Sequence, residues 1–267
     1  MATDHRATAR GPREWDAAGY DALPLPHEQW GQRLLATLPL TGDETVLDVG
    51  AGTGRDTAAL LDRLPRGHVV AVDGSAAMLD RLRGRLAGAD PARLTVLRAN
   101  LAAPLTGPLI LDGPLDGPAD AVFSVATLHW LPDHAVVFRS LAGVLRAGGL
   151  LRAEWGGAGN CANVETALAQ VGLPPLNAAC NFATDGATAQ RLRDAGFTDV
   201  HTALVPDPAR FEPGAQLEAY LGTVVLGSVL EQVPVADRAE LVHRVAAWLP
   251  EPSVDYVRLQ AGARRSG

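Results

Sequence analysis

Residues 46–58 read VLDVGAGTGRDTA. An apolar run typical of a buried strand ends at Asp48, and glycine then occupies every second position from Gly50 to Gly54. Apolar residues recur at helical spacing after the loop. Glycine allows a sharp turn with positive φ and, lacking a Cβ, lets a ligand approach the main chain. The following helix presents unpaired N–H groups at its start. This pattern predicts a strand, a tight turn and a helix start that together hold a ligand.

A dinucleotide-binding loop is the main alternative for such a turn. That fingerprint is G-x-G-x-x-G, and its third glycine would fall on Arg55. The dehydrogenase interpretation is therefore the weakest one.

An acidic residue supports the glycine loop. Residues 69–73 read VVAVD and end in Asp73, 19 residues after Gly54. A carboxylate at the end of the second strand can accept hydrogen bonds from both ribose hydroxyls of a nucleoside. The alternative, in which Asp73 caps the helix that starts near Ser75, is compatible with that role. The agreement in spacing favours the ligand role.

Composition limits the classes of partner. The chain has 267 residues, 47% of them hydrophobic, which suffices for a sizeable core. The formal net charge is −7 and no block of Lys or Arg occurs, so nucleic acid and membrane partners are not expected. Residues 1–14 lack an apolar signal-peptide core and residues 121–131 are too few to span a bilayer, which predicts a cytoplasmic location. Cys161 and Cys180 lack metal-ligand spacing and are expected to be buried thiols, with no metal site.

Strands and helices alternate along the chain. Apolar runs of the kind found in parallel strands are expected at 94–98, 119–126 and 150–155, with helices at 55–64, 75–86 and from about 133 to 145. Residues 1–12 are expected to be disordered, and 103–118 form a Pro/Gly-rich loop that is a candidate flap. The second half predicts helices at 164–171, 185–195, 215–233 and 235–249, and strands at 199–205 and 254–261.

The chain resembles the class I S-adenosylmethionine-dependent methyltransferases, in particular the trans-aconitate methyltransferase-like small-molecule enzymes. The segments that carry this resemblance are VLDVGAGTGRDTAALLDRLP, VVAVDGSAAML, DAVFSVATLHWLPDHAVVF, VLRAGGLL, WGGAGN, RLRDAGFTDV and DYVRLQAGARR. It implies an α/β, doubly wound, Rossmann-like fold: a seven-stranded mixed sheet whose last strand inserts antiparallel, with helical lid additions. A single domain over 13–264 would comprise lid helices (13–40), a cofactor-binding half (43–156) and substrate-side helices with the last two strands (157–264).

The resemblance also implies the contacts to S-adenosylmethionine. Asp48 and the glycine loop would lie against its methionine part and ribose, Asp73 would bind the ribose hydroxyls, and Met78 would pack on the adenine. After the third strand the family usually has Asp, whereas this chain has Asn100. An amide oxygen can still accept from the adenine amino group, without ionic assistance. The expected cofactor residues are Tyr20, Trp30, Asp48, Gly50, Ala51, Gly52, Gly54, Asp73, Gly74, Met78, Asn100, Leu101, Ser124, Val125, Ala126 and His129.

Four rings gather near the N-terminus: Trp15, Tyr20, His27 and Trp30. A helix over 27–38 would carry Trp30 on its apolar face. The rings either form a lid over the cofactor, whose sulfonium cation aromatic faces attract, or anchor this helix to the domain.

His129 is the candidate catalytic base, because it follows the fourth strand at the edge where ligands bind in such folds. The alternative is a histidine that orients the loop or contacts the cofactor. Trp130 and Arg258 are the expected substrate contacts. Arg258, beside Tyr256, would pair with an acidic substrate or form a structural salt bridge.

Three functions remain open. The first is O-methylation of a small carboxylic acid, and the second is methylation of oxygen, nitrogen or carbon in a secondary-metabolite pathway. The third is a non-catalytic module that binds the cofactor. A carboxylate is already ionised at neutral pH and needs no base, whereas a phenol, alcohol or amine usually does. The expected partner is a small-molecule methyl acceptor, and the expected state is a monomer or homodimer.

Overall fold

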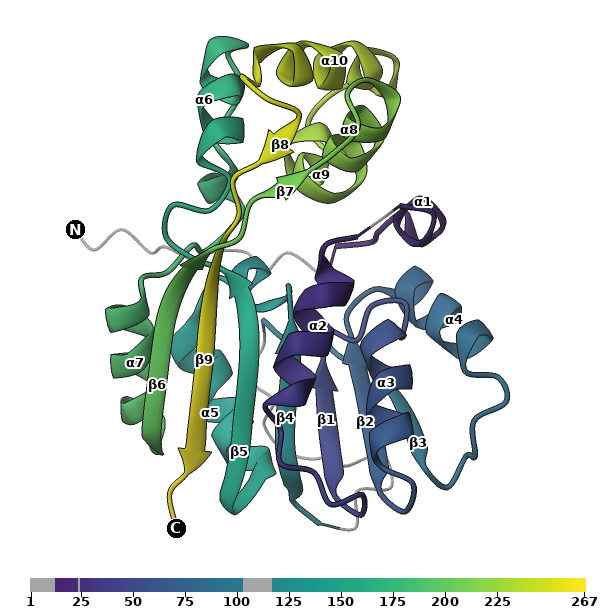
Figure 1. The fold of residues 1–267 in the computed structure, drawn as a ribbon, viewed down its shortest axis with the longest axis vertical. Coiled ribbons are helices and arrows are strands. Elements are labelled where there is room, and N and C mark those ends of the chain that lie inside the picture. Colours follow the sequence, from purple (N-terminus) through teal and green to yellow (C-terminus); the bar gives the residue numbers. More distant parts are fainter. Residues whose placement is uncertain (1–12, 24, 103–116) are drawn as a thin grey trace, which may run out of the picture.

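The computed structural model describes residues 13–23, 25–102 and 117–267. Its centre is a seven-stranded sheet with the order β3-β2-β1-β4-β5-β9-β6 (Figure 1). The first five strands run parallel, and β9 runs antiparallel to both β5 and β6. The predicted mixed sheet with an inserted last strand is thus confirmed. Its strands are β1 Thr45–Val49, β2 His68–Asp73, β3 Leu94–Arg98, β4 Ala119–Val125, β5 Leu145–Gly156, β6 Phe197–Pro206 and β9 Val257–Arg265.

Helices cover both faces of the sheet. Val69 and Val70 are neighbours in β2, both are fully buried, and they belong to two different apolar cores. This two-sided burial explains why the central strands are continuous apolar runs. The helices of one face are α2 His27–Ala36, α3 Arg55–Arg63 and α4 Ala76–Arg85, and those of the other are α5 His134–Val144 and α7 Asp185–Asp194 (Figure 1).

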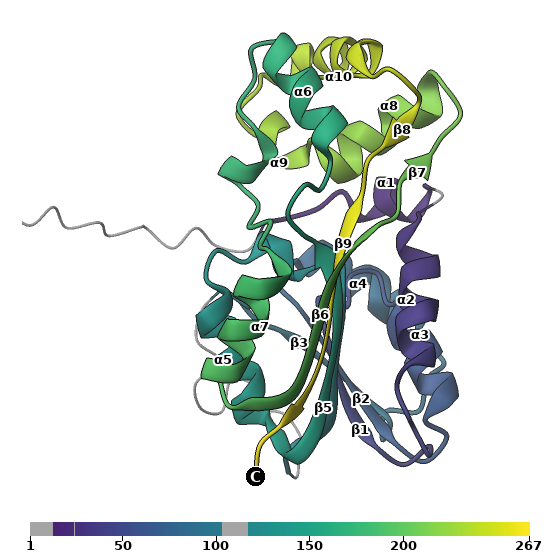
Figure 2. The ribbon, with the colours of Figure 1, turned by 60° about the vertical axis from the view of Figure 1, so that its left-hand side comes forward.

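A helical cap lies beyond the carboxyl ends of the parallel strands (Figure 2). One part of the cap follows β5 and precedes α7 in the chain, and the other part is entered and left through a two-stranded sheet that follows β6 and precedes β9. The short helix α1 Ala17–Asp21 lies between the cap and the sheet edge. The cap consists of α6 Ala162–Gln170, α8 Ala215–Tyr220, α9 Gly227–Leu230, α10 Arg238–Trp248, β7 Ala209–Arg210 and β8 Ser253–Val254.

Several predicted boundaries in the second half were wrong. The helix expected over 215–233 is divided into α8, a π-helical turn Leu221–Val225 and α9. Packing decides this break, because the turn buries Leu221, Val224 and Val225 in the core. The helix expected over 235–249 is present within one residue of its predicted bounds, and its first turn is a 3₁₀ turn before α10.

The strand boundaries also differ. The strand expected at 150–155 begins at Leu145, where a register shift against β4 accommodates Gly148 with a φ of 76°. The strand expected at 254–261 is split into β8 and β9, because the chain passes there from the cap to the sheet. The predictions for residues 1–12 and for 103–116 of the candidate flap lie outside the described residues.

Cys161 and Cys180 are buried and free, as predicted. Within residues 13–23, 25–102 and 117–267, no helix is long and apolar enough to cross a membrane.

Candidate cofactor and acceptor site

The glycine loop follows β1 at the carboxyl edge of the sheet. Gly50, Gly52 and Gly54 have φ angles of 79°, 54° and 84°. A Cβ on Gly50 would lie 2.0 Å from Thr127 Oγ1, and one on Gly54 would lie 2.7 Å from Leu82 Cγ. A Cβ on Gly52 would meet nothing within 4 Å. Gly50 and Gly54 therefore let neighbouring elements pack, whereas Gly52 faces open space that a ligand can enter.

Asp73 ends β2 and directs its carboxylate to this loop. Oδ2 accepts from the Gly52 N–H at 2.9 Å, and Oδ1 accepts from the Ser75 N–H at 2.8 Å. Ser75 is itself the residue that caps α4, by accepting from the Met78 N–H. Burial raises the pKa of Asp73. One carboxylate thus joins the loop to the helix start, beside the open space at Gly52, where ribose hydroxyls can bind it.

Asp48 is a buried acid whose carboxyl group accepts a hydrogen bond from a hydroxyl. Its Oδ2 accepts from Thr57 Oγ1 at 2.6 Å, and its residue is 2% exposed. Burial, with Asp56 nearby, raises the pKa of Asp48 to about 8, and burial raises the pKa of Asp56 to about 7. Asp48 is therefore mostly protonated at neutral pH and links β1 to α3 as a neutral group.

Two of the remaining predicted cofactor residues already use their polar side-chain atoms in hydrogen bonds within the protein. Ser124 Oγ donates to a β1 carbonyl at 2.7 Å inside the sheet, so this hydroxyl holds two strands together. Asn100 Oδ1 accepts a backbone N–H two residues later, at 3.0 Å. Ala126 has a φ of 54°, unusual for a residue with a Cβ, at the end of β4. At the same edge lie Ala51, Gly74, Met78, Leu101 and Val125.

His129 lies in a 3₁₀ turn, Leu128–Trp130, directly after β4. Its Nδ1 accepts from the Gly156 N–H at 3.4 Å, which leaves the proton of the neutral ring on Nε2. Burial, with Arg258 and His27 nearby, lowers the pKa of His129 well below its ordinary value. At neutral pH the imidazole is therefore a hydrogen-bond donor through Nε2. This geometry fits the orienting role better than that of a base.

Arg258 and Trp30 lie in the interior. The Arg258 guanidinium binds Glu154 Oε1 at 3.2 Å and lies over the Trp30 ring, 3.8 Å from its centroid. Arg258 is 1% exposed and Trp30 2%, and Trp30 Nε1 donates to Asp207 at 2.6 Å. The salt bridge of Arg258 is thus the structural one, while its contact to substrate and the contact of Trp30 to cofactor stay predictions.

The other N-terminal rings contact one another and Trp130, an expected substrate contact. Tyr20 hydroxyl lies 3.1 Å from His27 Nδ1. Trp15 packs edge-to-face on Trp130, with ring centroids 5.2 Å apart. The rings therefore anchor the N-terminal segment across the sheet edge, which agrees with the hypothesis that they hold this segment to the domain. Their position at this edge is also compatible with a lid.

Sequence reasoning missed two acids of this segment, Glu14 and Asp21. Glu14 binds the start of α4, and Asp21 binds Thr53 in the glycine loop. A carboxylate in a polar segment is normally solvated, so no local pattern distinguishes these two. Only the nearby rings indicated that the segment packs on the domain.

Two hollows lie away from the glycine loop. One, of about 390 Å³, lies between α2 and the face of β5, β9 and β6, and the other, of about 660 Å³, lies between α2 and the start of the cap. Neither hollow is lined by the loop or by Asp73. Residues of the segment 13–22 contact that edge through Asp21 and Glu14. We therefore identify the candidate site from the chemistry of the glycine loop and of Asp73, and not from the volume of a hollow.

Comparison with known proteins agrees with this geometry. A family model described as a methyltransferase domain matches residues 47–151. A trans-aconitate 2-methyltransferase from Azoarcus sp. (strain BH72) is 35% identical over 137 residues, 51% of this chain and 49% of that protein. Residues 47–151 therefore match a methyltransferase domain, and the sheet has the class I methyltransferase fold. S-adenosylmethionine is the methyl donor of this family, and the similarity is to its trans-aconitate methyltransferase-like branch.

The other similarities extend this methyltransferase assignment. A malonyl-[acyl-carrier protein] O-methyltransferase from Xylella fastidiosa (strain M23) is 33% identical over 162 residues, 60% of this chain and 52% of that protein. The chain spans about half the length of the curated relatives it matches. The phosphoethanolamine N-methyltransferase 2 of Haemonchus contortus, solved with S-adenosylhomocysteine, shares the fold with a TM-score of 0.58 and 15% identity, over 90% of this chain and 53% of that one. The open space at Gly52 and the Asp73 carboxylate fit the nucleoside of such a ligand.

Proposed function

We propose that this methyltransferase methylates a carboxylate oxygen of a small organic acid. The observation that carries the proposal is the hydrogen bond that His129 Nδ1 accepts from the Gly156 N–H. We infer from it that the neutral ring keeps its proton on Nε2, which is then a hydrogen-bond donor and not a base. A carboxylate nucleophile is ionised at neutral pH, needs no base and accepts hydrogen bonds. The names of two relatives, trans-aconitate 2-methyltransferase and malonyl-[acyl-carrier protein] O-methyltransferase, each refer to a carboxylic acid.

Each group then has a defined task. Asp73 holds the ribose in the space beside Gly52, and His129 donates to the acceptor or to the adjoining part of the cofactor. When bound, S-adenosylmethionine supplies an electrophilic methyl group on a sulfonium sulfur. Holding the two reactants in line contributes up to roughly 7 to 11 kcal/mol to lowering the barrier of such a reaction. The residues of this edge therefore act mainly by positioning.

The first experiment is a calorimetric titration of the wild type and Asp73→Ala with S-adenosylmethionine and S-adenosylhomocysteine. We expect binding by the wild type and loss of binding in the variant, because the variant lacks both acceptors for the ribose hydroxyls. No binding by the wild type would contradict the methyltransferase assignment of the site.

The second experiment identifies the acceptor. Transfer of labelled methyl groups is followed over a panel of small acids, beginning with polycarboxylic acids, and the product is treated with mild base. An ester releases its label, and its rate of formation stays level from about pH 6 to 8, because carboxylic acids of pKa near 4 are fully ionised there. A base-stable product formed at a rate that rises with pH would instead favour methylation of nitrogen, carbon or a phenol. Tight binding of cofactor without turnover on any acceptor would favour a binding module.

A further inference from the structure

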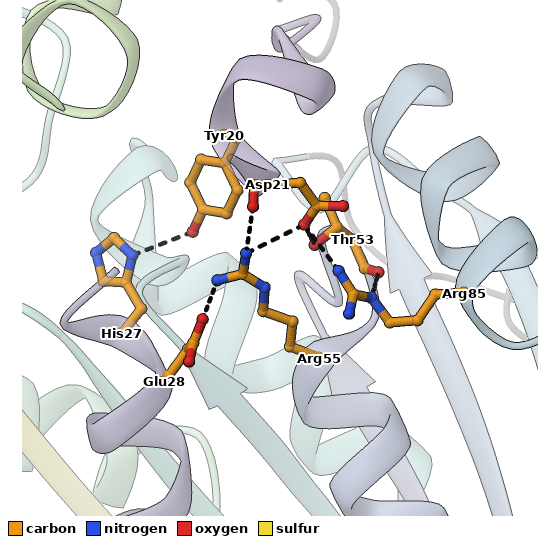
Figure 3. A network of polar contacts seen from close by, with 7 residues as sticks. All are labelled: Tyr20, Asp21, His27, Glu28, Thr53, Arg55 and Arg85. Carbon is orange, nitrogen blue, oxygen red and sulfur yellow. Dashed lines mark hydrogen bonds and ion pairs between the residues drawn. The ribbon is translucent and has the colours of Figure 1, made fainter. Parts of the chain in front are cut away.

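Asp21, at the end of α1, is bound to three elements at once (Figure 3). Its Oδ1 accepts from Thr53 Oγ1 at 2.7 Å and from Arg85 Nη2 at 2.9 Å. Arg55 Nη2 lies 3.4 Å from the same oxygen and donates to the Asp21 carbonyl at 2.9 Å. The contact therefore joins α1 to the glycine loop, to α4 and to the start of α3.

Thr53 of the glycine loop is bound by two side chains, Arg85 and Asp21. Arg85 Nε donates to the Thr53 carbonyl at 2.8 Å, while the Thr53 hydroxyl donates to Asp21. The side chains are 19% exposed for Asp21, 22% for Arg55 and 35% for Arg85, so solvent screens these charges only in part. Arg55, the residue that departs from the dinucleotide fingerprint, also pairs with Glu28 of α2.

Glu14, seven residues before Asp21, forms a second attachment of this segment to the domain. Its carboxylate accepts from Ser75 Oγ at 2.8 Å and from the Ala76 N–H at 3.1 Å, and it pairs with Arg98 at 2.8 Å. A carboxylate at the start of α4 is stabilised by the unpaired N–H groups and the dipole of that helix.

The two attachments lie on either side of Asp73. That residue binds Gly52, next to Thr53, and Ser75, which binds Glu14. Residues 13–22, which we name the strap, therefore cross the edge where the ribose is expected. Arg13 continues the strap to the cap by pairing with Glu231 at 2.9 Å.

We propose that the strap retains the bound cofactor, and that Asp21 is the positioning residue whose contacts with Thr53 and Arg85 must break before an S-adenosyl compound can leave. This inference rests on the proposed function for the identity of the ligand only. The strap touches both the loop and the cap, so its release opens the nucleoside end of the site without disturbing the sheet.

The test compares Asp21→Asn with a matched control, Asp80→Asn. Asp80 pairs with Arg83 on the exposed face of α4, with side chains 76% and 51% exposed. The release of S-adenosylhomocysteine is followed by stopped-flow tryptophan fluorescence, and its Kd by calorimetry. We expect Asp21→Asn to release the ligand about 10-fold faster or more, since charge-assisted bonds are lost. The same contacts are formed in the free protein, so association should also accelerate and Kd should change by less than the release rate. Asp80→Asn should match the wild type.

The salt dependence separates a strap from a general loss of stability. Release from the wild type should accelerate with added salt, which screens the ion pairs. Release from Asp21→Asn should accelerate less, because only the pairs of Glu14 with Arg98 and of Arg13 with Glu231 remain in the strap. Arg85→Gln gives an independent route if Asp21→Asn fails to fold, and it should also release the ligand faster. Wild-type release rates in both variants would overturn the strap. No binding of S-adenosylhomocysteine by the wild type would instead overturn the proposed function.

Discussion

Replacing Asp48 by Asn should change how the stability of the protein depends on pH. The amide keeps an oxygen that can accept from the Thr57 hydroxyl, now 2.6 Å from Asp48 Oδ2, but it cannot ionise. The Asp48 carboxyl is buried, and its pKa is raised from 3.8 to about 8. The two proteins therefore differ mainly in whether this position can release a proton.

The sign follows from proton linkage. Between pH 3.8 and about 8 the folded wild type keeps a proton on Asp48 that the unfolded chain has lost. Its free energy of unfolding therefore falls as pH rises, by up to about 1.4 kcal/mol per pH unit. The stabilisation is complete below the unfolded pKa and is gone above the folded one. From pH 5 to 7, Asp48→Asn should gain about 1 to 3 kcal/mol relative to the wild type, the upper value being the full linkage slope over two units.

The assay is urea unfolding at pH 5, 6 and 7 for the wild type, Asp48→Asn and Asp80→Asn. The curve for the exposed Asp80 variant should run parallel to the wild type. A difference between Asp48→Asn and the wild type that stays constant from pH 5 to 7 would show that Asp48 is already ionised in the native protein. The reasoning from burial would then be refuted.

Three further predictions concern the same edge of the sheet. Gly50→Ala should cost about 2 to 4 kcal/mol of stability, because it adds a steric clash to a positive φ, whereas Gly52→Ala should cost only about 1 to 2 kcal/mol yet abolish S-adenosylhomocysteine binding; urea unfolding and calorimetry test the pair. Arg258→Met should lower the free energy of unfolding by about 3 to 5 kcal/mol, because it leaves Glu154 buried without its cation. Adding Glu154→Gln should restore part of the loss. A double variant less stable than Arg258→Met alone would contradict the buried ion pair. His129→Ala should slow methyl transfer while the Kd for S-adenosylhomocysteine stays within about threefold, and a Kd raised in step with the lost rate would assign this side chain to cofactor binding instead.

Much of the cofactor edge could be predicted from the sequence. Three glycines after an apolar run are a local pattern, and their positive φ angles follow from the absence of a Cβ. Asp73 was recognised by its distance along the chain from the loop, because consecutive parallel strands place their carboxyl ends together. The mixed seven-stranded sheet with its inserted antiparallel last strand followed from the resemblance to a known family, which carries topology that periodicity alone does not.

The tertiary structure decided the contacts between residues far apart in the chain. Glu154 and Arg258 are 104 positions apart, and only the antiparallel insertion of β9 beside β5 pairs them in the interior. The division of the helix expected over 215–233 arises from packing in the cap, which overrides helical periodicity.

The protonation states of His129 and Asp48 could likewise not be predicted from the sequence. His129 is a donor because the N–H of Gly156 reaches its Nδ1, and Asp48 holds a proton because burial and the nearby Asp56 disfavour its charged form. Local spacing determined the strand, the turn and the acid of the second strand. Burial and neighbours brought from distant parts of the chain determined what each of these groups can do, since a pKa and a free lone pair depend on the whole environment of an atom.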